Sequence, residues 1–291
     1  MKNPHLKIGL ALGSGSARGW AHIGVIEVLQ QAGIPIHCIA GCSIGSVVGA
    51  IYSAGSLPQF SQWVRGLNRR NMAQLIDISF SGGGVMSGKK LMHFLKQFNL
   101  DQSIESLPIK FASVSTDLHT GREIWLTEGD LSLAIRSSIS LPGLFQPVDY
   151  HDAWLVDGGL VNPVPVSLCR AMGADIVIGV NLNHDLMQPR KVLAPDASKD
   201  GLNIESWLKK LIGWDERPGY YSVLSQSIKI MQDRITKARA GGDPADISIE
   251  PLLADFSLYD FHKADGAIRE GMEATQRQLA LITKIIELCQ H

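Results

Sequence analysis

The amino-acid sequence predicts an α/β fold with parallel strands, on the strength of its opening segment and one later apolar run. The stretch 7–12 is apolar after Lys7 and leads directly into a glycine-rich loop, after which a helical stretch at 20–32 ends at Gly33. A second apolar run follows at 34–40. A strand, helix and strand in this order imply two parallel strands joined by a right-handed crossover. A strongly apolar run at 175–182 predicts a further buried strand.

Composition and charge are typical of an ordinary globular protein. Hydrophobic residues make up 45% and charged residues 19% of the 291 residues, so the chain can bury a large core and we expect one domain over 1–291. Lys and Arg number 27 against 28 Asp and Glu. This balance lacks the basic charge that nucleic-acid binding requires, and it excludes that class of partner.

The cysteines and the apolar runs limit the cellular setting. Neither paired nor metal-ligand spacing occurs among Cys38, Cys42, Cys169 and Cys289, so we predict no metal and no cofactor, and a reducing, cytoplasmic location. No apolar run approaches the roughly 18 residues of a spanning helix. We therefore expect any contact with a membrane to be peripheral.

Apolar periodicity and the turn residues that bound it predict the remaining core elements. In chain order these are a mostly helical stretch at 56–108, strands at 109–116 and 122–126, a helix at 130–137, a strand at 154–156 and a helix at 164–172. Glycine-rich loops at 81–84 and 87–88 interrupt the first stretch, and Asp130 is a typical N-cap. Together with the opening strands they form a motif-bearing core over 7–182.

An excursion and a closing set of helices follow this core. Residues 184–218 begin polar and proline-rich and include an amphipathic helix at 204–213. Helices at 220–240 and 263–289 and a strand at 247–249 make up the final part, 219–291. The apolar face that carries Trp207 leaves three alternatives open: packing on the domain, packing on another subunit of a homo-oligomer, and peripheral docking on a lipid surface.

The second strand runs into Gly41-Cys42-Ser43-Ile44-Gly45, and small apolar residues at helical spacing follow. A strand, a sharp Gly-x-Ser-x-Gly turn and a helix are the parts of a nucleophile elbow. The serine must adopt a strained backbone there, so any side chain at Gly41 or Gly45 would collide with neighbouring backbone. Ser43 is therefore our candidate nucleophile.

A serine nucleophile needs an oxyanion hole, and the loop Gly13-Ser14-Gly15-Ser16 is the candidate. These residues precede a helix, so their N–H groups lie at the positive end of its dipole. Arg18 could steady the loop or meet an anionic head group. A nucleotide site is the rival interpretation, but the spacing Gly-x-Gly-x-x-x-Gly fits neither a dinucleotide fingerprint nor a Walker loop.

The serine also needs a base, and histidine is the first type to consider. Ser43 follows only two predicted strands, however, whereas an ordinary α/β-hydrolase places its serine after several. Asp157 fits better, because Gly158 and Gly159 let its carboxylate approach another loop closely. Asp-Gly is also common in plain turns, so a purely structural role for Asp157 remains the alternative.

Four motifs in order resemble the patatin-like phospholipase family. They are the glycine-rich stretch from Gly9 through Arg18-Gly19 to Val25, the Gly-Cys-Ser-Ile-Gly turn, Ser138-Ile139-Ser140-Leu141-Pro142, and Asp157-Gly158-Gly159. Residues 154–159 and the closing Asp260-Phe261-His262 resemble in particular the small bacterial RssA-type members. Many members of the family carry glycine where this chain has Ser14 and Ser16, which leaves the loop with less freedom here.

The resemblance implies a three-layer α/β/α fold with a mainly parallel central sheet. It also implies hydrolysis of lipid or other acyl esters by a Ser-Asp dyad without histidine, with Ser43 as nucleophile, Asp157 as base and the glycine-rich loop as oxyanion hole. A regulatory or scaffolding protein that keeps this fold with weak or no activity is the alternative function. Two other candidates are weaker: Cys42 should point away from the turn, and His22 is typical of a packing histidine inside a helix.

Overall fold

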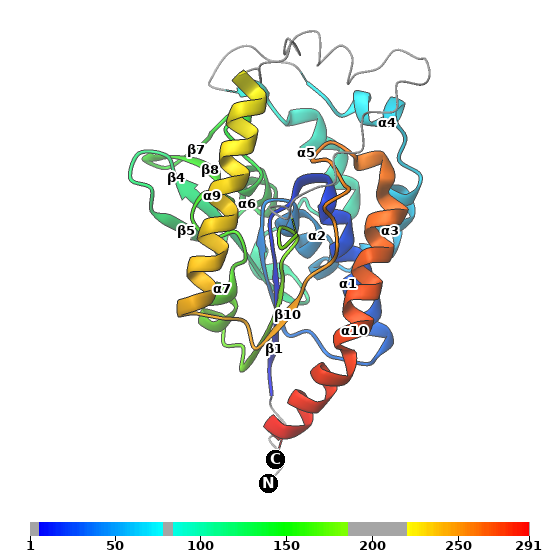
Figure 1. The fold of residues 1–291 in the computed structure, drawn as a ribbon. Coiled ribbons are helices and arrows are strands. Elements are labelled where there is room, and N and C mark those ends of the chain that lie inside the picture. Colours follow the sequence, from blue (N-terminus) through cyan, green and yellow to red (C-terminus); the bar gives the residue numbers. More distant parts are fainter. Residues whose placement is uncertain (1–5, 78–83, 186–219, 291) are drawn as a thin grey trace.

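A mainly parallel sheet runs through the centre of the molecule (Figure 1). The structure, a computed structural model, describes residues 6–77, 84–185 and 220–290. Within these ranges the eight strands of the sheet are β1 (Ile8–Leu12), β2 (Cys38–Cys42), β4 (Lys110–Asp117), β5 (Glu123–Leu126), β7 (Val148–Tyr150), β8 (Ala153–Asp157), β9 (Ile176–Val180) and β10 (Ile247–Ile249). Two further strands, β3 (Gly84–Met86) and β6 (Gly143–Phe145), pair with each other in a small second sheet.

Five neighbouring strands of the large sheet are parallel, in the order β10-β9-β1-β2-β4. The carboxyl ends of β1 and β2 therefore open onto one edge, where ligands bind in open α/β sheets. At β4 the pattern changes. Strands β5 and β8 are antiparallel to β4, and β7 is antiparallel to β8.

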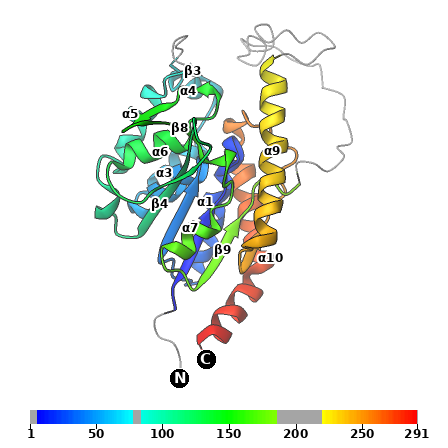
Figure 2. The same cartoon turned by 90° about the vertical axis from the view of Figure 1, so that its left-hand side faces the viewer.

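Helices cover both faces of the sheet. The longer ones are α1 (Ala21–Gln31), α2 (Ile44–Ser53), α3 (Leu57–Arg65), α6 (Leu131–Ser138), α9 (Tyr220–Gly242) and α10 (Ala264–Gln290). The shorter ones are α4 (Arg69–Gln74), α5 (Lys89–Leu95), α7 (Val166–Ala171) and the 3-10 turns η1 (Ser16–Trp20), η2 (Lys96–Phe98), η3 (Ile104–Ser106), η4 (Gly158–Leu160) and η5 (Phe261–Lys263). In Figure 1, α3 and α10 lie on one side of the central strands, and α7 and α9 lie on the other; Figure 2 shows the molecule from the side of α7 and α9.

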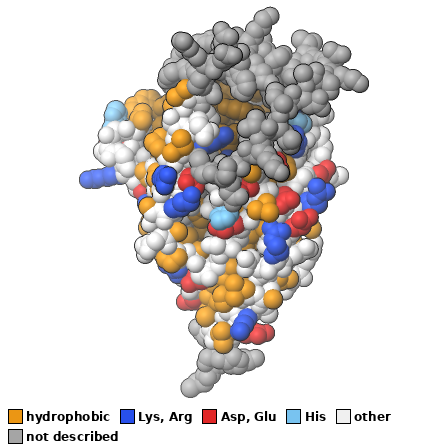
Figure 3. Space-filling model, in the orientation of Figure 1, with side chains coloured by type: hydrophobic (Ala, Val, Ile, Leu, Met, Phe, Trp, Pro, Cys, Tyr) orange, Lys and Arg blue, Asp and Glu red, His pale blue; other side chains and the backbone are white. Residues whose placement is uncertain are grey.

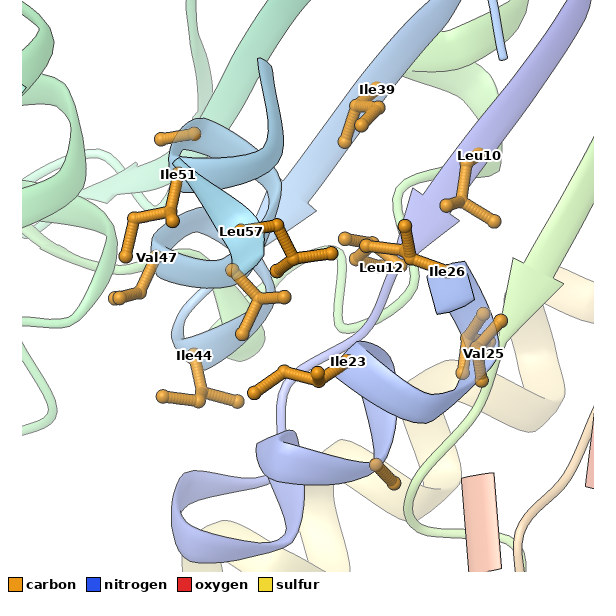
Figure 4. Close-up of a cluster of buried hydrophobic side chains, with 14 of the residues drawn as sticks. Leu10, Leu12, Ile23, Val25, Ile26, Ile39, Ile44, Val47, Ile51 and Leu57 are labelled. Carbon is orange, nitrogen blue, oxygen red and sulfur yellow. The ribbon is translucent and has the colours of Figure 1, made fainter. Parts of the chain in front are cut away.

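Side-chain size separates the two faces of the central strands. On one face, large aliphatic residues of β1 and β2 pack against α1, α2 and α3, as the close-up in Figure 4 shows for Leu10, Leu12 and Ile39. On the other face the strands present Ala11, Ala40 and Ala112 toward α7. Because side chains alternate along a strand, this sequence pattern buries both faces and fixes the register.

The predicted parallel α/β fold is confirmed, and several element boundaries differ. The second strand was expected at 34–40, but β2 covers Cys38–Cys42. Just before β2, the side chain of His37 takes part in the pairing with β1. Its Nδ1 accepts the Ile8 N–H at 3.0 Å, and its backbone N–H donates to the Ile8 carbonyl at 2.8 Å. The helix expected at 164–172 is shorter, since α7 covers Val166–Ala171, and strands β3, β6 and β7 were not predicted.

Two further expectations concern membranes and the excursion. None of the helices in the described ranges is both long and apolar enough to cross a lipid bilayer. The amphipathic helix expected at 204–213, with Trp207, lies outside the described residues. On the face seen in Figure 3, basic and acidic side chains are interspersed, in keeping with the formal net charge of −1.

Candidate active site

Ser43 forms the turn between β2 and α2 by itself. Strand β2 ends at Cys42 and α2 begins at Ile44, and the backbone of Ser43 has φ 54° and ψ −122°. This left-handed region is strained for a residue with a side chain, and such strain persists only where the surroundings hold it. The expected elbow conformation is therefore present, and it directs a partly exposed Ser43 side chain away from the strand.

The two glycines of the elbow allow the chain to approach its neighbours closely. A Cβ at Gly41 would lie 2.4 Å from Ser46 Cα, and a Cβ at Gly45 would lie 2.1 Å from the carbonyl oxygen of Leu12. Both distances are far below contact with backbone atoms that cannot move aside. Glycine is therefore required at both positions, and the elbow packs directly against the end of β1.

Strands β2 and β8 meet end to end on one edge of β4. A strand has two edges, and β4 is paired with β5 at 113–116, with β2 at 110–114 and with β8 at 115–117. Since β5 takes one edge, β2 and β8 share the other. There Cys42 is opposite Val114 and Asp157 is opposite Ser115. Asp157 thus lies immediately beyond the end of β2, where Ser43 turns away.

The Asp157 carboxylate accepts a hydrogen bond on each oxygen. Ser43 Oγ donates to Oδ2 at 2.6 Å, and the Gly159 N–H donates to Oδ1 at 2.7 Å. The Asp-Gly-Gly turn needs its glycines here, since a Cβ at Gly158 would lie 2.3 Å from the Val114 carbonyl oxygen. The turn therefore presents the carboxylate to Ser43 at hydrogen-bonding distance.

Hydrogen bonds from neighbouring elements hold the backbone of both residues. The Asp157 N–H donates to the Ser140 carbonyl at 3.0 Å, and Thr116 Oγ1 donates to the Asp157 carbonyl at 2.9 Å. The Ser43 N–H donates to Ser138 Oγ at 2.9 Å. Helix α6 and the residues that follow it therefore fix the positions of both members of the pair.

Burial changes the acidity of Asp157. The side chain is fully buried, and this desolvation raises the pKa of Asp157 to about 6, although the hydrogen bonds from Ser43 and Gly159 act in the opposite direction. A carboxylate with a pKa near 6 is largely ionised at pH 7 and is still basic enough to accept a proton. These are the properties of a general base that works near neutral pH.

The glycine-rich loop between β1 and η1 offers fewer amides than the sequence suggested. The Gly13 N–H donates to the Val180 carbonyl at 3.1 Å, and the Ser14 N–H donates to the Pro163 carbonyl at 2.9 Å. These two amides are not available to an oxyanion. Among the described residues, no partner accepts the N–H of Gly15 or Ser16. The candidate oxyanion hole is therefore corrected from four residues to the amides of Gly15 and Ser16.

Two side chains of this loop point into the protein. Arg18 is buried, and its Nε donates to the Gly15 carbonyl at 3.3 Å, which supports the loop and leaves no exposed guanidinium for an anionic head group. Ser16 has φ 53°, and its Oγ donates to the Leu258 carbonyl at 2.7 Å. Ser16, one of the two serines that depart from the family pattern, thus uses its hydroxyl to anchor the loop.

The competing nucleophile and base are poorly placed. Cys42 is fully buried, and burial raises the pKa of its thiol well above the ordinary value, with the charge of Asp157 adding to the effect. His22 is also buried, which lowers its pKa to about 4, and its Nε2 bonds the Gly13 carbonyl at 2.8 Å. Within the described ranges, neither Ser43 nor Asp157 hydrogen-bonds a histidine, and no group of His, Cys, Asp and Glu side chains could hold a metal ion.

Comparison with known proteins decides the family. The model of the patatin-like phospholipase family matches residues 10–170, which include the elbow and the Asp157 turn. An uncharacterized NTE family protein of Mycobacterium tuberculosis is 39% identical over 320 residues, covering 91% of this chain and 89% of the relative. The chain belongs to the patatin-like phospholipase family. At the level of that family, it is a lipid ester hydrolase.

Longer relatives match this chain over a small part of their own length. Human patatin-like phospholipase domain-containing protein 6 is 29% identical over 71% of this chain, which corresponds to 14% of the human protein. Neuropathy target esterase sws of Drosophila melanogaster is 32% identical over 71% of this chain and 14% of its own length. The crystal structure of VipD from Legionella pneumophila has the same fold, with a TM-score of 0.57 at 15% identity over 96% of this chain and 67% of VipD.

The candidate site also contains a supporting residue, Arg136, that the sequence patterns did not identify. Arg136 of α6 donates to Ser140 Oγ at 2.6 Å and to the carbonyls of Ser87 and Gln146 at 2.8 and 2.9 Å. It therefore ties β3 and β6 to the residue whose carbonyl holds Asp157. In the sequence, only the neighbouring run Ser138-Ile139-Ser140 pointed to this region. Arg136 itself could not be identified, because its carbonyl partners lie far away in the sequence and leave no local pattern.

Proposed function

We propose that this chain is a serine acyl hydrolase that cleaves lipid acyl esters through a Ser43-Asp157 dyad and an acyl-Ser43 intermediate. One observation carries the proposal: the 2.6 Å hydrogen bond from Ser43 Oγ to Oδ2 of a buried Asp157 whose pKa is raised to about 6. Nucleophile and base are in direct contact, without an intervening imidazole. Membership of the patatin-like phospholipase family supports the choice of a lipid ester.

In the first half of the reaction, Ser43 Oγ attacks the ester carbonyl and Asp157 takes the hydroxyl proton. The carbonyl oxygen gains the negative charge, and we assign its stabilisation to the N–H groups of Gly15 and Ser16. The tetrahedral species collapses when the bond to the alcohol oxygen breaks. Asp157 returns its proton to that oxygen, so the alcohol leaves as a neutral molecule and the acyl group stays on Ser43.

In the second half, water takes the place of the alcohol. Asp157 accepts a proton from the water as its oxygen attacks the acyl-Ser43 carbonyl, and the same two amides stabilise the oxyanion. Collapse breaks the bond to Ser43 Oγ, which regains a proton from Asp157, and a carboxylic acid is released. The dyad returns to its starting state, so a single carboxylate serves both halves.

Active-site labelling tests this proposal directly. A fluorophosphonate probe should label Ser43 in the wild type, and peptide mapping should locate the adduct. Ser43→Ala should not label and should not hydrolyse p-nitrophenyl esters of increasing chain length or lysophospholipids. Equal labelling of wild type and Ser43→Ala would overturn the assignment. A wild type that labels nowhere and hydrolyses none of these esters would favour the regulatory or scaffolding alternative instead.

Contact with a membrane and with a second copy of the chain stay predictions. Their sequence basis is the apolar face around Trp207, which lies outside the described residues. A second tryptophan, Trp214, directly follows this predicted helix. Co-sedimentation of a Trp207→Ala, Trp214→Ala variant with liposomes would separate lipid docking from packing. Loss of binding favours docking, whereas unchanged binding favours packing.

A further inference from the structure

Three successive carbonyl groups of the glycine-rich loop each accept a hydrogen bond from a buried side chain. The bonds run from His22 Nε2 to the Gly13 carbonyl at 2.8 Å, from Asn183 Nδ2 to the Ser14 carbonyl at 3.3 Å, and from Arg18 Nε to the Gly15 carbonyl at 3.3 Å. A carbonyl can only accept, so the assignment of the donor is unambiguous in each case. The three bonds turn the loop carbonyls toward the interior.

The orientation of each carbonyl determines the orientation of the next amide. In a trans peptide the C=O and the N–H that follows it point in opposite directions, and no cis peptide occurs among the described residues. A donor that holds the Ser14 carbonyl therefore fixes the direction of the Gly15 N–H. A donor that holds the Gly15 carbonyl likewise fixes the direction of the Ser16 N–H. These are the two amides of the loop for which no described residue is an acceptor.

We propose that Asn183 is a positioning residue that aims the Gly15 N–H at the oxyanion. Arg18 aims the Ser16 N–H in the same way, but Arg18 lies within the loop motif itself. Asn183 comes from a distant part of the chain, beyond the family match at 10–170. The inference rests on the proposed function, because it assigns a role to the oxyanion hole of that same site.

The backbone around Asn183 is held beside the loop, and its side chain is buried there. The residue is 2% exposed and follows β9, whose last residue, Val180, accepts the Gly13 N–H. The Asn183 N–H donates to Asn181 Oδ1 at 3.0 Å, which turns the chain toward the loop. Leu182 packs so closely on Gly15 that a Cβ there would lie 2.7 Å from its Cδ1. Strand β9 and its extension thus lie along the loop, with the amide of Asn183 directed at the Ser14 carbonyl.

The role makes a kinetic distinction possible. An oxyanion forms only in the transition state, so an amide that is aimed wrongly should lower kcat and leave KM nearly unchanged. A trifluoromethyl ketone with the acyl chain of the best ester substrate forms a hemiketal oxyanion on Ser43. If the Gly15 N–H is aimed wrongly, the affinity of the enzyme for this ketone should therefore fall by the same factor as kcat/KM.

Asn183→Asp is the decisive variant, because it keeps the shape of the side chain and replaces the donor by an acceptor. A carboxylate beside the Ser14 carbonyl repels it and releases the peptide. We expect kcat to fall on the order of 10- to 100-fold, with KM changed by less than about threefold, and the affinity for the trifluoromethyl ketone to fall in parallel with kcat/KM. Asn183→Ala removes the donor without repulsion and should show the same pattern, at about tenfold.

His184→Gln is the matched control. The neighbouring His184 is exposed and pairs with Glu250 at 3.0 Å, so its loss should leave kcat, KM and inhibitor affinity unchanged. An unchanged kcat in both Asn183 variants, or a lower kcat with unchanged affinity for the trifluoromethyl ketone, would overturn the inference. If Asn183→Asp does not fold, Asn183→Ala decides by the same criteria. Failure of the proposed function is distinguishable, because the wild type itself would then neither hydrolyse esters nor bind the ketone at Ser43.

Discussion

The proposed dyad and the candidate oxyanion loop form two halves of the proposed site, and different kinds of contact hold them. Ser43 and Asp157 are brought together by the backbone, because β2 and β8 occupy the same edge of β4 and end at adjacent positions. The loop at 13–16 is positioned mainly by contacts from outside the strands. The Leu258 carbonyl accepts the Ser16 hydroxyl, and Asn183 holds the Ser14 carbonyl.

This difference indicates how each half should respond to change. Strand register tolerates side-chain substitution, since ladder hydrogen bonds do not depend on residue type, so substitutions at the dyad should affect chemistry more than fold. The loop depends on individual side-chain donors, so substitutions there should shift geometry and stability together. The variants below separate the two halves by comparing turnover with stability.

The largest effect should come from Asp157→Asn. The amide can still accept the Gly159 N–H and keeps the shape of the turn, but it cannot take the proton of Ser43 Oγ. We expect turnover of p-nitrophenyl esters to fall on the order of 10³-fold, with the circular dichroism spectrum unchanged. Asp149→Asn, on the exposed side of neighbouring β7, is the matched control and should remain fully active. More than a tenth of wild-type turnover in Asp157→Asn would rule out Asp157 as the base.

The same variant should be more stable than the wild type at neutral pH. Folding raises the pKa of Asp157 to about 6, above the value near 4 expected in the unfolded chain, so the folded state holds this proton more tightly. The unfolding free energy of the wild type therefore falls as pH rises from about 4 to about 6, by about 3 kcal/mol. Since the variant has no carboxylate at this position, urea denaturation at pH 7.5 should give a higher unfolding free energy for Asp157→Asn than for the wild type, by the same amount. At pH 4 the difference should vanish, and a constant difference would mean that the carboxylate is not destabilised by burial.

The pH dependence of catalysis should report the same group. Asp157 must be ionised to act as a base, so kcat/KM should fall about tenfold for each pH unit below an inflection near pH 6. A neutral p-nitrophenyl ester avoids titration of the substrate. The residual activity of Asp157→Asn should lack this inflection. An unchanged inflection in the variant would assign it to another group.

Sequence patterns predicted the half of the site that depends on local geometry. The elbow was predicted from Gly41, Ser43 and Gly45 together with the strand expected before them and the helix expected after them. The structure shows why glycine is needed at the flanking positions, where a Cβ would approach backbone to 2.4 and 2.1 Å. Parallel order of the first strands followed from their connection. That Asp157 lies next to Ser43 depends on the register of β8 on β4, which no single stretch contains, although the Asp-Gly-Gly turn identified the residue.

The loop could not be predicted to the same depth. The sequence shows four backbone N–H groups before a helix. Nothing near them in the chain indicates that the carbonyls of Val180 and Pro163 accept the N–H groups of Gly13 and Ser14. Both acceptors come from chain segments far along the sequence. Only the packed fold brings them to the loop, so the count of available amides is a tertiary property rather than a feature of the motif.

The smallest effects should come from Ser16, where the loop departs from the family pattern. Ser16→Ala loses the bond to the Leu258 carbonyl and keeps the left-handed backbone, so the unfolding free energy should fall by about 1 kcal/mol. Ser16→Gly loses the same bond but relieves the backbone, which should recover part of that loss. Because both variants keep the amide N–H, turnover should change less than about tenfold. A loss of turnover in Ser16→Ala as large as that in Asp157→Asn would mean that the hydroxyl itself takes part in the reaction. The two halves of the site would then differ less than their contacts indicate.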